Sequence, residues 1–185
     1  PEFGQIAFHA IDAARDKIFV QLLKMSAAPP AMNGKVPDVV IWPETAIPFL
    51  LNDRPDAYTA IAATLSEGQV LLAGSVRKEG DRKAGEEIRY YNSLLMIDDA
   101  GEMVGAADKR HLVPFGEYLP FQDLLQSFGL TQLAKLPGGF TGGAARKNLT
   151  LPNGFKLNPL ICYEAIFPRE IQTLDGRADL LVNIT

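Results

Sequence analysis

Blocks of hydrophobic residues alternate with polar turns along the chain, and their periods predict helices interleaved with strands. Between residues 5 and 27, four apolar side chains recur at helical spacing and share one face: Ile11, Ile18, Leu22 and Met25. The Pro29-Pro30 pair then ends this helix. A second helix is predicted over residues 55–66 and a short third one over 168–174.

Short runs rich in β-branched and large apolar residues predict the strands. They cover residues 38–42, 69–76, 89–97, 102–109, 148–151, 155–163 and 179–185. Turn residues at 98–101 and 152–154 predict two antiparallel hairpins. Several runs are apolar throughout, which is typical of strands covered on both faces. The pattern therefore predicts a layered α/β fold.

Composition narrows the class of protein. The 185 residues are 47% hydrophobic and suit one domain or part of one. With 18 basic and 22 acidic residues, the net charge of −4 argues against a nucleic-acid partner. The single cysteine excludes an internal disulfide, and no Cys/His group has the spacing of a metal site. Because the chain starts without Met and stops within a predicted strand, we expect a fragment.

Cys162 follows an apolar strand and precedes a turn, a common place for a nucleophile, although a lone cysteine is more often a small buried hydrophobe. A free thiol is mostly protonated at pH 7, so a nucleophile needs a base or a cation nearby. Glu44 and Lys109 offer one of each after other strands. The alternatives are a turn-capping carboxylate for Glu44 and a solvated Lys-Arg pair for Lys109 and Arg110.

The region between residues 110 and 147 is long and irregular, and such loops are usually functional or disordered. Its apolar residues, Phe121 through Leu133, either cover the site or contact lipid, or else they pack on the domain. Glu117 is a candidate to orient Lys109, or else an ordinary loop carboxylate. The glycine-rich run 138–143 lacks the Lys-Ser/Thr of a phosphate-binding loop, so we interpret it as flexible.

The order Glu44, Lys109, Cys162 resembles the Glu-Lys-Cys triad of the nitrilase (carbon–nitrogen hydrolase) superfamily. Three segments are more narrowly similar to the family of apolipoprotein N-acyltransferases. These are Trp-Pro-Glu-Thr at 42–45, Lys-Arg-His-Leu-Val-Pro-Phe-Gly-Glu-Tyr-Leu-Pro at 109–120, and Ile-Cys-Tyr-Glu at 161–164 with Phe167-Pro168. The middle segment is the most discriminating, because soluble nitrilases usually do not share its continuation.

The resemblance implies an αββα sandwich, incomplete at both ends, with residues 1–185 forming part of a catalytic domain. It also implies upstream transmembrane helices that hold this domain on the periplasmic face of a bacterial inner membrane. The loop at 110–147 is a further candidate for membrane contact. No cofactor is implied.

The reaction implied is acyl transfer from a phospholipid, through a thioester on Cys162, to the N-terminal amine of the diacylglyceryl-cysteine of an apolipoprotein. Glu44 would act as the base, and Lys109 with the backbone N–H of Tyr163 would stabilise the oxyanion. Glu117 and Glu164 would support the site. Two alternatives stay open: a soluble amidase or nitrilase with the same triad and water as acceptor, and a non-catalytic scaffold with the same fold.

Overall fold

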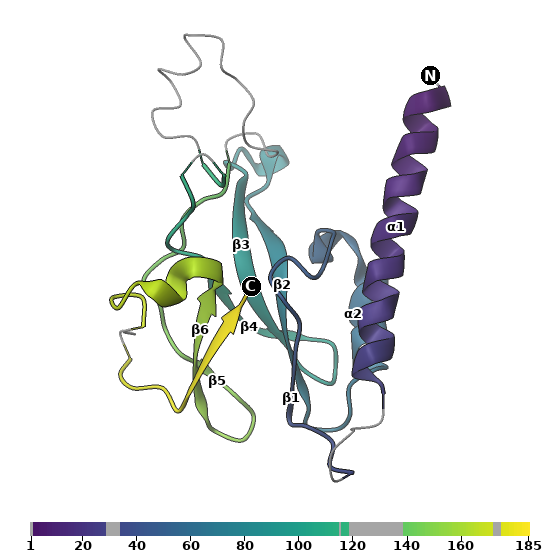
Figure 1. The fold of residues 1–185 in the computed structure, drawn as a ribbon. Coiled ribbons are helices and arrows are strands. Elements are labelled where there is room, and N and C mark those ends of the chain that lie inside the picture. The colour runs from purple at the N-terminus through teal and green to yellow at the C-terminus, as the bar shows by residue number, and fades with distance from the viewer. Residues whose placement is uncertain (1, 29–33, 115, 119–138, 172–174) are drawn as a thin grey trace.

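The computed structural model describes residues 2–28, 34–114, 116–118, 139–171 and 175–185, and Figure 1 shows their arrangement. Two α-helices lie on one side of a four-stranded sheet, and a three-stranded sheet lies on its other side. The helices are α1 (Glu2–Ser26) and α2 (Pro55–Ala62). Single 3₁₀ turns cover Leu51–Asp53, Arg82–Ala84 and Cys162–Ile166.

The first sheet has the strand order β1-β2-β3-β4. Its strands are β1 (Val39–Ile41), β2 (Val70–Glu79), β3 (Arg89–Ile97) and β4 (Met103–Asp108). β1 pairs with β2 in parallel, whereas β2, β3 and β4 form an antiparallel meander. The hairpin expected between 89–97 and 102–109 is therefore confirmed.

The second sheet has the order β5-β6-β7. Its strands are β5 (Leu149–Thr150), β6 (Lys156–Ile161) and β7 (Leu180–Ile184). β5 and β6 form the second expected hairpin, and β7 pairs with β6 in parallel. β6, which leads to Cys162, is thus the central strand and is held by backbone hydrogen bonds on both sides.

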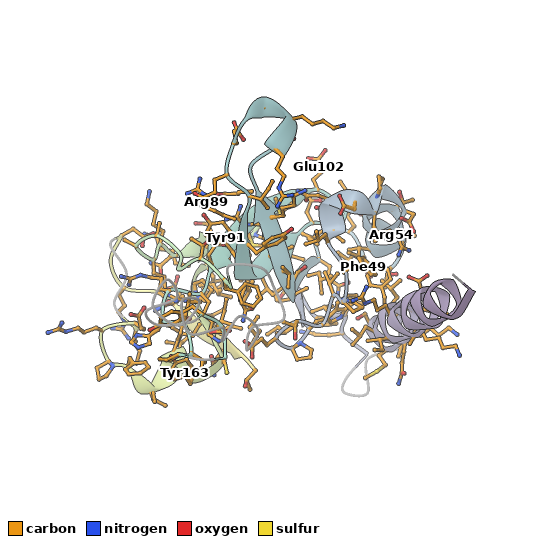
Figure 2. All side chains as sticks on the ribbon, turned by 90° about the horizontal axis from the view of Figure 1, so that it is seen from above. Phe49, Arg54, Arg89, Tyr91, Glu102 and Tyr163 are labelled. Atoms are coloured by element: carbon orange, nitrogen blue, oxygen red, sulfur yellow. The ribbon has the colours of Figure 1, made fainter. Side chains whose placement is uncertain are left out.

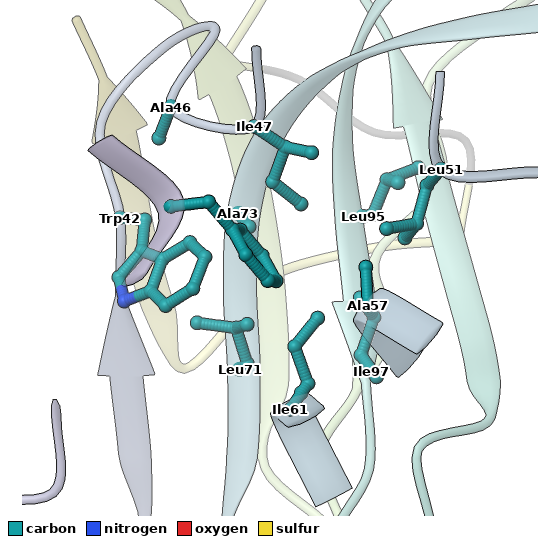
Figure 3. Packing of buried hydrophobic residues seen from close by; sticks show 11 residues of the cluster. Trp42, Ala46, Ile47, Leu51, Ala57, Ile61, Leu71, Ala73, Leu95 and Ile97 are labelled. Carbon is teal, nitrogen blue, oxygen red and sulfur yellow. The ribbon is translucent and has the colours of Figure 1, made fainter. Parts of the chain in front are cut away.

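Alternation along β2 and β3 builds two cores, because successive side chains of a strand point to opposite faces. One face sends Leu71, Ala73, Leu95 and Ile97 toward the helices, where they pack in a cluster with Trp42 (Figure 3). The opposite face packs on the second sheet in a cluster of Val70, Leu72, Leu94, Met96, Leu151, Leu157, Ile161 and Ile184. The described residues therefore supply three layers of a sandwich: helices, sheet and sheet.

The buried face of α1 differs from the expected one. Ile18 and Met25 are 50% and 65% exposed, whereas Phe19 is 4% exposed and contacts Trp42 edge-on. Leu22 packs against this core as predicted, together with Phe19 and Leu23, and the side chain of Ile11 lies outside the described part. On the same face the indole of Trp42 donates a hydrogen bond to Ser26 Oγ (2.9 Å), which helps to hold this rotation of the helix. Arg54, labelled beside α1 in Figure 2, pairs with Asp16 at 2.9 Å.

Two further expectations were wrong. The outer strands β1 and β7 are not covered on both faces: Ile41 and Leu181 are about half exposed, since each strand has a neighbour on one side only among the described residues. The helix expected over 168–174 is absent from its described part, where residues 168–171 form turns. Residues 172–174 lie outside the described residues. The helical turn begins at Cys162 instead.

Candidate active site

Glu44 lies on a loop that leaves the first sheet and returns to it. Trp42 N donates to Leu72 O (2.8 Å) as β1 ends, and Ile47 N donates to Gly74 O (3.1 Å) where pairing with β2 resumes. Between these anchors the chain bulges outward. Thr45 adopts the left-handed conformation (φ 50°), which costs a residue with a Cβ about 1–2 kcal/mol. The bulge still contacts β2, since Gly74 N donates to Pro43 O (3.2 Å), and it presents Glu44 beside this strand.

Gly74 is what lets this bulge lie directly on β2. A Cβ at position 74 would stand 2.4 Å from Pro43 O, 2.6 Å from Glu44 Cα and 2.6 Å from Thr45 N. All three atoms are backbone, so none can swing away. A glycine in the middle of a buried strand is often the sign of such a close approach, but the sequence does not reveal which segment approaches it.

Lys109 is buried at the end of β4, with 1% of its surface exposed. Its backbone N–H donates to Asn92 O (2.8 Å), which extends the β3–β4 ladder to the site. Its ammonium donates to Glu117 Oε1 (2.8 Å) and to Glu44 Oε1 (3.3 Å). The solvated Lys-Arg pair is therefore excluded for Lys109, because a buried ammonium must be compensated by carboxylates.

Asn92 is a member of the site that sequence reasoning missed. Its side chain is 2% exposed, and the same amide nitrogen donates to Glu44 Oε1 (2.7 Å) and to Glu117 Oε1 (3.1 Å). Asn92 and Lys109 thus face the same two carboxylate oxygens from β3 and β4. The one signal in the sequence was a polar residue within the apolar run 89–97.

The two glutamates differ in how their second oxygens are bonded. Glu117 Oε2 accepts the backbone N–H of Val113 (2.8 Å), so both oxygens of Glu117 are occupied. Glu44 Oε2 has no hydrogen-bond partner within the part of the chain that the structure describes. The geometry leaves Glu44 with an acceptor for an incoming proton, whereas Glu117 is bound in a fixed orientation.

The electrostatics keep Lys109 charged. Burial alone would lower the pKa of its ammonium, but the hydrogen bond and charge of Glu117, with the charges of Glu44 and Cys162, raise that pKa above its usual value. An ammonium has three N–H donors. Two are directed to the glutamates, which leaves one to stabilise a developing negative charge.

Cys162 lies where β6 ends and the 3₁₀ turn begins. It is half-buried and has φ 57°, in the left-handed region. In the described residues, Thr45 and Cys162 are the two non-glycine residues with positive φ, and one adjoins Glu44 while the other carries the thiol. Strain of this kind clusters at functional sites because the surrounding structure imposes it. Cys162 also packs against the core between the two sheets, so its conformation supports the functional hypothesis while part of its surface serves the packing.

Glu164 connects the turn at Cys162 to the segment after Lys109. It is fully buried, and its Oε2 accepts the N–H of Ile161 (2.9 Å), directly before Cys162. Its Oε1 accepts the N–H groups of Arg110 (2.7 Å) and His111 (3.2 Å). Arg146, a second residue missed from the sequence, is 4% exposed and lies 2.6 Å from Oε2, where it compensates the charge. Glu164 therefore holds backbone on both sides of the site.

Tyr163 covers the ammonium. Its ring centroid is 5.5 Å from Lys109 Nζ, and its hydroxyl donates to Leu112 O (2.8 Å). Burial raises the pKa of the phenol. His111 stacks on Phe167 with ring centroids 4.0 Å apart and packs edge-on against Tyr163, so it has a packing role beside the site. Figure 2 shows Tyr163 on the side of the molecule away from α1.

The glycine-rich run packs against the site, which corrects its interpretation as a flexible loop. In its described part, Phe140 N donates to Glu117 O (2.7 Å) and Gly143 N donates to Lys109 O (2.9 Å). An open recess of about 360 Å³ lies beside it, lined by Arg110, His111, Leu112, Tyr118 and Phe140. The apolar segment that was expected to cover the site, Phe121 through Leu133, lies outside the described residues. Across the described ranges, no three His, Cys, Asp or Glu side chains are grouped to hold a metal ion.

The sequence profile of carbon–nitrogen hydrolases matches residues 6–185, which is almost the whole chain. The chain belongs to the carbon–nitrogen hydrolase family. Its fold agrees: a carbon–nitrogen hydrolase from Helicobacter pylori G27 superposes with a TM-score of 0.63 at 18% identity, over 92% of this chain and 55% of that one. A mutant amidase of the nitrilase superfamily from Nesterenkonia AN1 gives 0.57 at 16% identity, over 89% and 57%. The expected nitrilase-like sandwich is confirmed.

Curated relatives are much closer in sequence. A protein named apolipoprotein N-acyltransferase from Sinorhizobium medicae (strain WSM419) is 54% identical over 94% of this chain. Another so named, from Rhizobium rhizogenes (strain K84), is 50% identical over 100% of it. The chain spans about a third of the length of these relatives, 33% and 34%. No described helix is long and apolar enough to cross a membrane.

Within this carbon–nitrogen hydrolase chain, the structure brings three of the predicted site residues into direct contact: Glu44, Lys109 and Glu117. Tyr163 contacts the cation through its ring, and the charge of Cys162 acts on the same ammonium. Glu164 is buried behind these groups rather than beside them.

Proposed function

We propose that the chain is the catalytic part of an apolipoprotein N-acyltransferase, which moves a fatty acyl group from a phospholipid to the N-terminal amine of a diacylglyceryl-cysteine. The observation that carries this proposal is the 54% identity over 94% of the chain to a protein of that name. The arrangement of Glu44, Lys109 and Cys162 supports it, because these groups supply the base, the cation and the nucleophile of acyl transfer.

The proposal extends to the organisation of the whole protein. Residues 1–185 would be a partial carbon–nitrogen hydrolase domain, since the relatives are about three times as long. Transmembrane helices upstream of it would hold the domain on the periplasmic face of the inner membrane. There the site would meet its two partners, a phospholipid donor and an apolipoprotein acceptor.

In the first half-reaction, Glu44 Oε2 takes the proton of the Cys162 thiol, and the thiolate attacks the carbonyl carbon of the ester. The C–S bond forms, and the carbonyl oxygen becomes an oxyanion that the free N–H of Lys109 and the backbone N–H of Tyr163 stabilise. A donor of this kind is typically worth about 10²–10³-fold in rate. The C–O bond then breaks, and the proton on Glu44 passes to the leaving oxygen, releasing a lysophospholipid.

In the second half-reaction, the amine of the apolipoprotein attacks the thioester carbonyl. Glu44 takes a proton from the attacking nitrogen, and the same donors stabilise the second oxyanion. The C–N bond forms as the C–S bond breaks, and the proton returns to the sulfur of Cys162. Lys109 stays protonated throughout, which its raised pKa favours.

A soluble amidase or nitrilase would use the same three groups with water as acceptor. The solved amidase shares only the fold at 16% identity, whereas the named acyltransferases share half of the residues. The similarity therefore favours acyl transfer.

The test is to incubate the full-length protein with a phospholipid of defined acyl chains and measure the mass of the peptide that contains Cys162. We expect an added acyl group that hydroxylamine removes and that a diacylglyceryl-cysteine peptide accepts as an amide. Cys162→Ala is the control and should carry no acyl group. Hydrolysis of small amides without any acyl transfer to the peptide would instead establish the amidase.

A further inference from the structure

We propose that Asn92 is a positioning residue of this reaction: it holds the base Glu44 and the orienting Glu117 in register through one amide group. This inference rests on the proposed function and deepens it. Asn92 lies on β3, is 2% exposed, and directs its amide nitrogen to Oε1 of both glutamates, at 2.7 and 3.1 Å. No other described side chain except Lys109 bonds to both carboxylates.

The role follows from what one amide can do that an ammonium cannot. Its two N–H groups are fixed in a plane, so each is directed at a different acceptor. Each carboxylate is therefore held by its Oε1 atom, and Glu44 keeps Oε2 free for the thiol proton. The ammonium of Lys109 lies 3.3 Å from Glu44 Oε1, a longer contact than the 2.7 Å from the amide of Asn92, so the amide is the closer of the two donors that orient Glu44.

Asn92 also limits the charge of the site. The titratable or charged groups that face Glu44 or its Lys109 partner come from three parts of the chain: Lys109 after β4, Glu117 in the following loop, and Cys162 and Tyr163 in the 3₁₀ turn. The amide adds a donor among them without adding a charge. An aspartate of the same shape would place a third carboxylate against the other two, and like charges favour the protonated form of a carboxyl group.

Asn92→Asp should consequently make the cluster of three carboxyl groups retain an extra proton at neutral pH, which hinders transfer of the thiol proton to it. Raising the pH removes that proton again. In a plot of the reaction rate of the Cys162 thiol against pH, the rise at low pH therefore moves to higher pH, and the rate recovers as the pH increases.

Asn158 provides a matched control. It is also 2% exposed, also lies in a buried strand, and also has an unpaired buried Oδ1, but its amide donates to the carbonyl of Ile171 (2.6 Å). Asn158→Asp therefore buries the same new carboxylate away from Glu44 and Glu117. It reports the general cost of the substitution.

The experiment measures the rate of Cys162 alkylation by iodoacetamide against pH in the full-length protein, with thermal unfolding recorded for each variant. Asn92→Asp should shift the midpoint of the rate against pH upward by at least about one pH unit. At a pH below the midpoint this lowers the alkylation rate about tenfold relative to wild type. Asn158→Asp should leave the midpoint within about 0.3 unit of wild type. Equal midpoints for both variants, or an equal loss of rate at every pH, would overturn the positioning role.

A second variant keeps the proposal testable if Asn92→Asp does not fold. Asn92→Asp combined with Glu117→Gln restores two carboxylates and one amide in exchanged positions, so the midpoint should return toward wild type. Failure to return would count against the proposal. Alkylation needs no lipid. If Asn92→Asp shows the expected upward shift of the alkylation midpoint but the wild-type protein transfers no acyl group to a peptide, the proposed function is refuted and the role of Asn92 stands.

Discussion

Replacing Gly74 by alanine should displace Glu44, the proposed catalytic base, without changing its side chain. The new Cβ would stand 2.4 Å from Pro43 O, whereas ordinary contacts begin near 3.4 Å, so the bulge must move by about 1 Å. Glu44 is two bonds from that carbonyl and moves with it. The clash is with backbone, which leaves no side-chain rotation to relieve it.

The expected loss follows from that displacement. A shift of about 1 Å in a catalytic group costs on the order of 10²-fold in rate. Overpacking a buried strand also costs about 1–3 kcal/mol of unfolding free energy. Gly74→Ala should therefore fold with reduced stability and form the Cys162 thioester about 100-fold more slowly.

Gly105→Ala on β4 is the control. There a Cβ would stand 3.1 Å from Met96 Cε and 3.2 Å from Leu149 Cδ2, both ends of flexible side chains. Thioester formation is followed by quenching full-length protein with acid at timed intervals and measuring acylated Cys162 by mass spectrometry, with urea unfolding in parallel. If Gly74→Ala acylates within threefold of Gly105→Ala, the close approach does not position Glu44.

Three further predictions follow. Lys109→Met should abolish acylation and lower the unfolding free energy by up to about 3 kcal/mol, because two partly buried carboxylates lose the buried cation between them. Lys109→Met with Glu117→Gln should regain stability in urea unfolding but not activity. The pKa of Lys109 is raised on folding, so its stabilisation should be complete below the unfolded pKa of about 10.4 and decline as the pH rises above it. A difference in unfolding free energy between wild type and the double variant that already shrinks before the rising pH reaches about 9 would contradict this. Cys162→Gly should be about 0.5–1 kcal/mol more stable than Cys162→Ala, because glycine adopts positive φ without strain; equal urea midpoints would show that the left-handed turn is unstrained.

The strands that the sequence predicted best are those whose burial follows from their own composition. β2 and β3 are apolar over most of their length and are buried on both faces, as expected. The outer strands look equally apolar in sequence, but their exposure depends on the position in the sheet, which local composition does not encode. The rotation of α1 was predicted only in part for a similar reason, since a long-range hydrogen bond from Trp42 helps to hold Phe19 in the core.

In the candidate site, too, residues with a local sequence signal were predicted and residues that depend on distant partners were missed. Glu44, Lys109 and Cys162 were proposed because each follows an apolar strand, a signal that is local in sequence. Asn92 and Arg146 gave no comparable signal, because their roles depend on partners 48 and 18 residues away. The helix expected after Phe167 failed because the turn starts at Cys162, where Glu164 binds the preceding N–H of Ile161.

The contact of two glutamates with one lysine has a consequence for how turnover responds to salt. At rest the three groups carry one net negative charge. When a proton passes from Cys162 to Glu44, and later when the oxyanion replaces the thiolate, the negative charge moves within the site, and the total for these three groups together with Cys162 and the bound acyl group stays constant. Mobile ions in the surrounding water therefore have no change of charge to screen during the chemical step. Any dependence of turnover on ionic strength should then report the docking of lipid or apolipoprotein, and single-turnover acylation of bound lipid should be nearly independent of added salt.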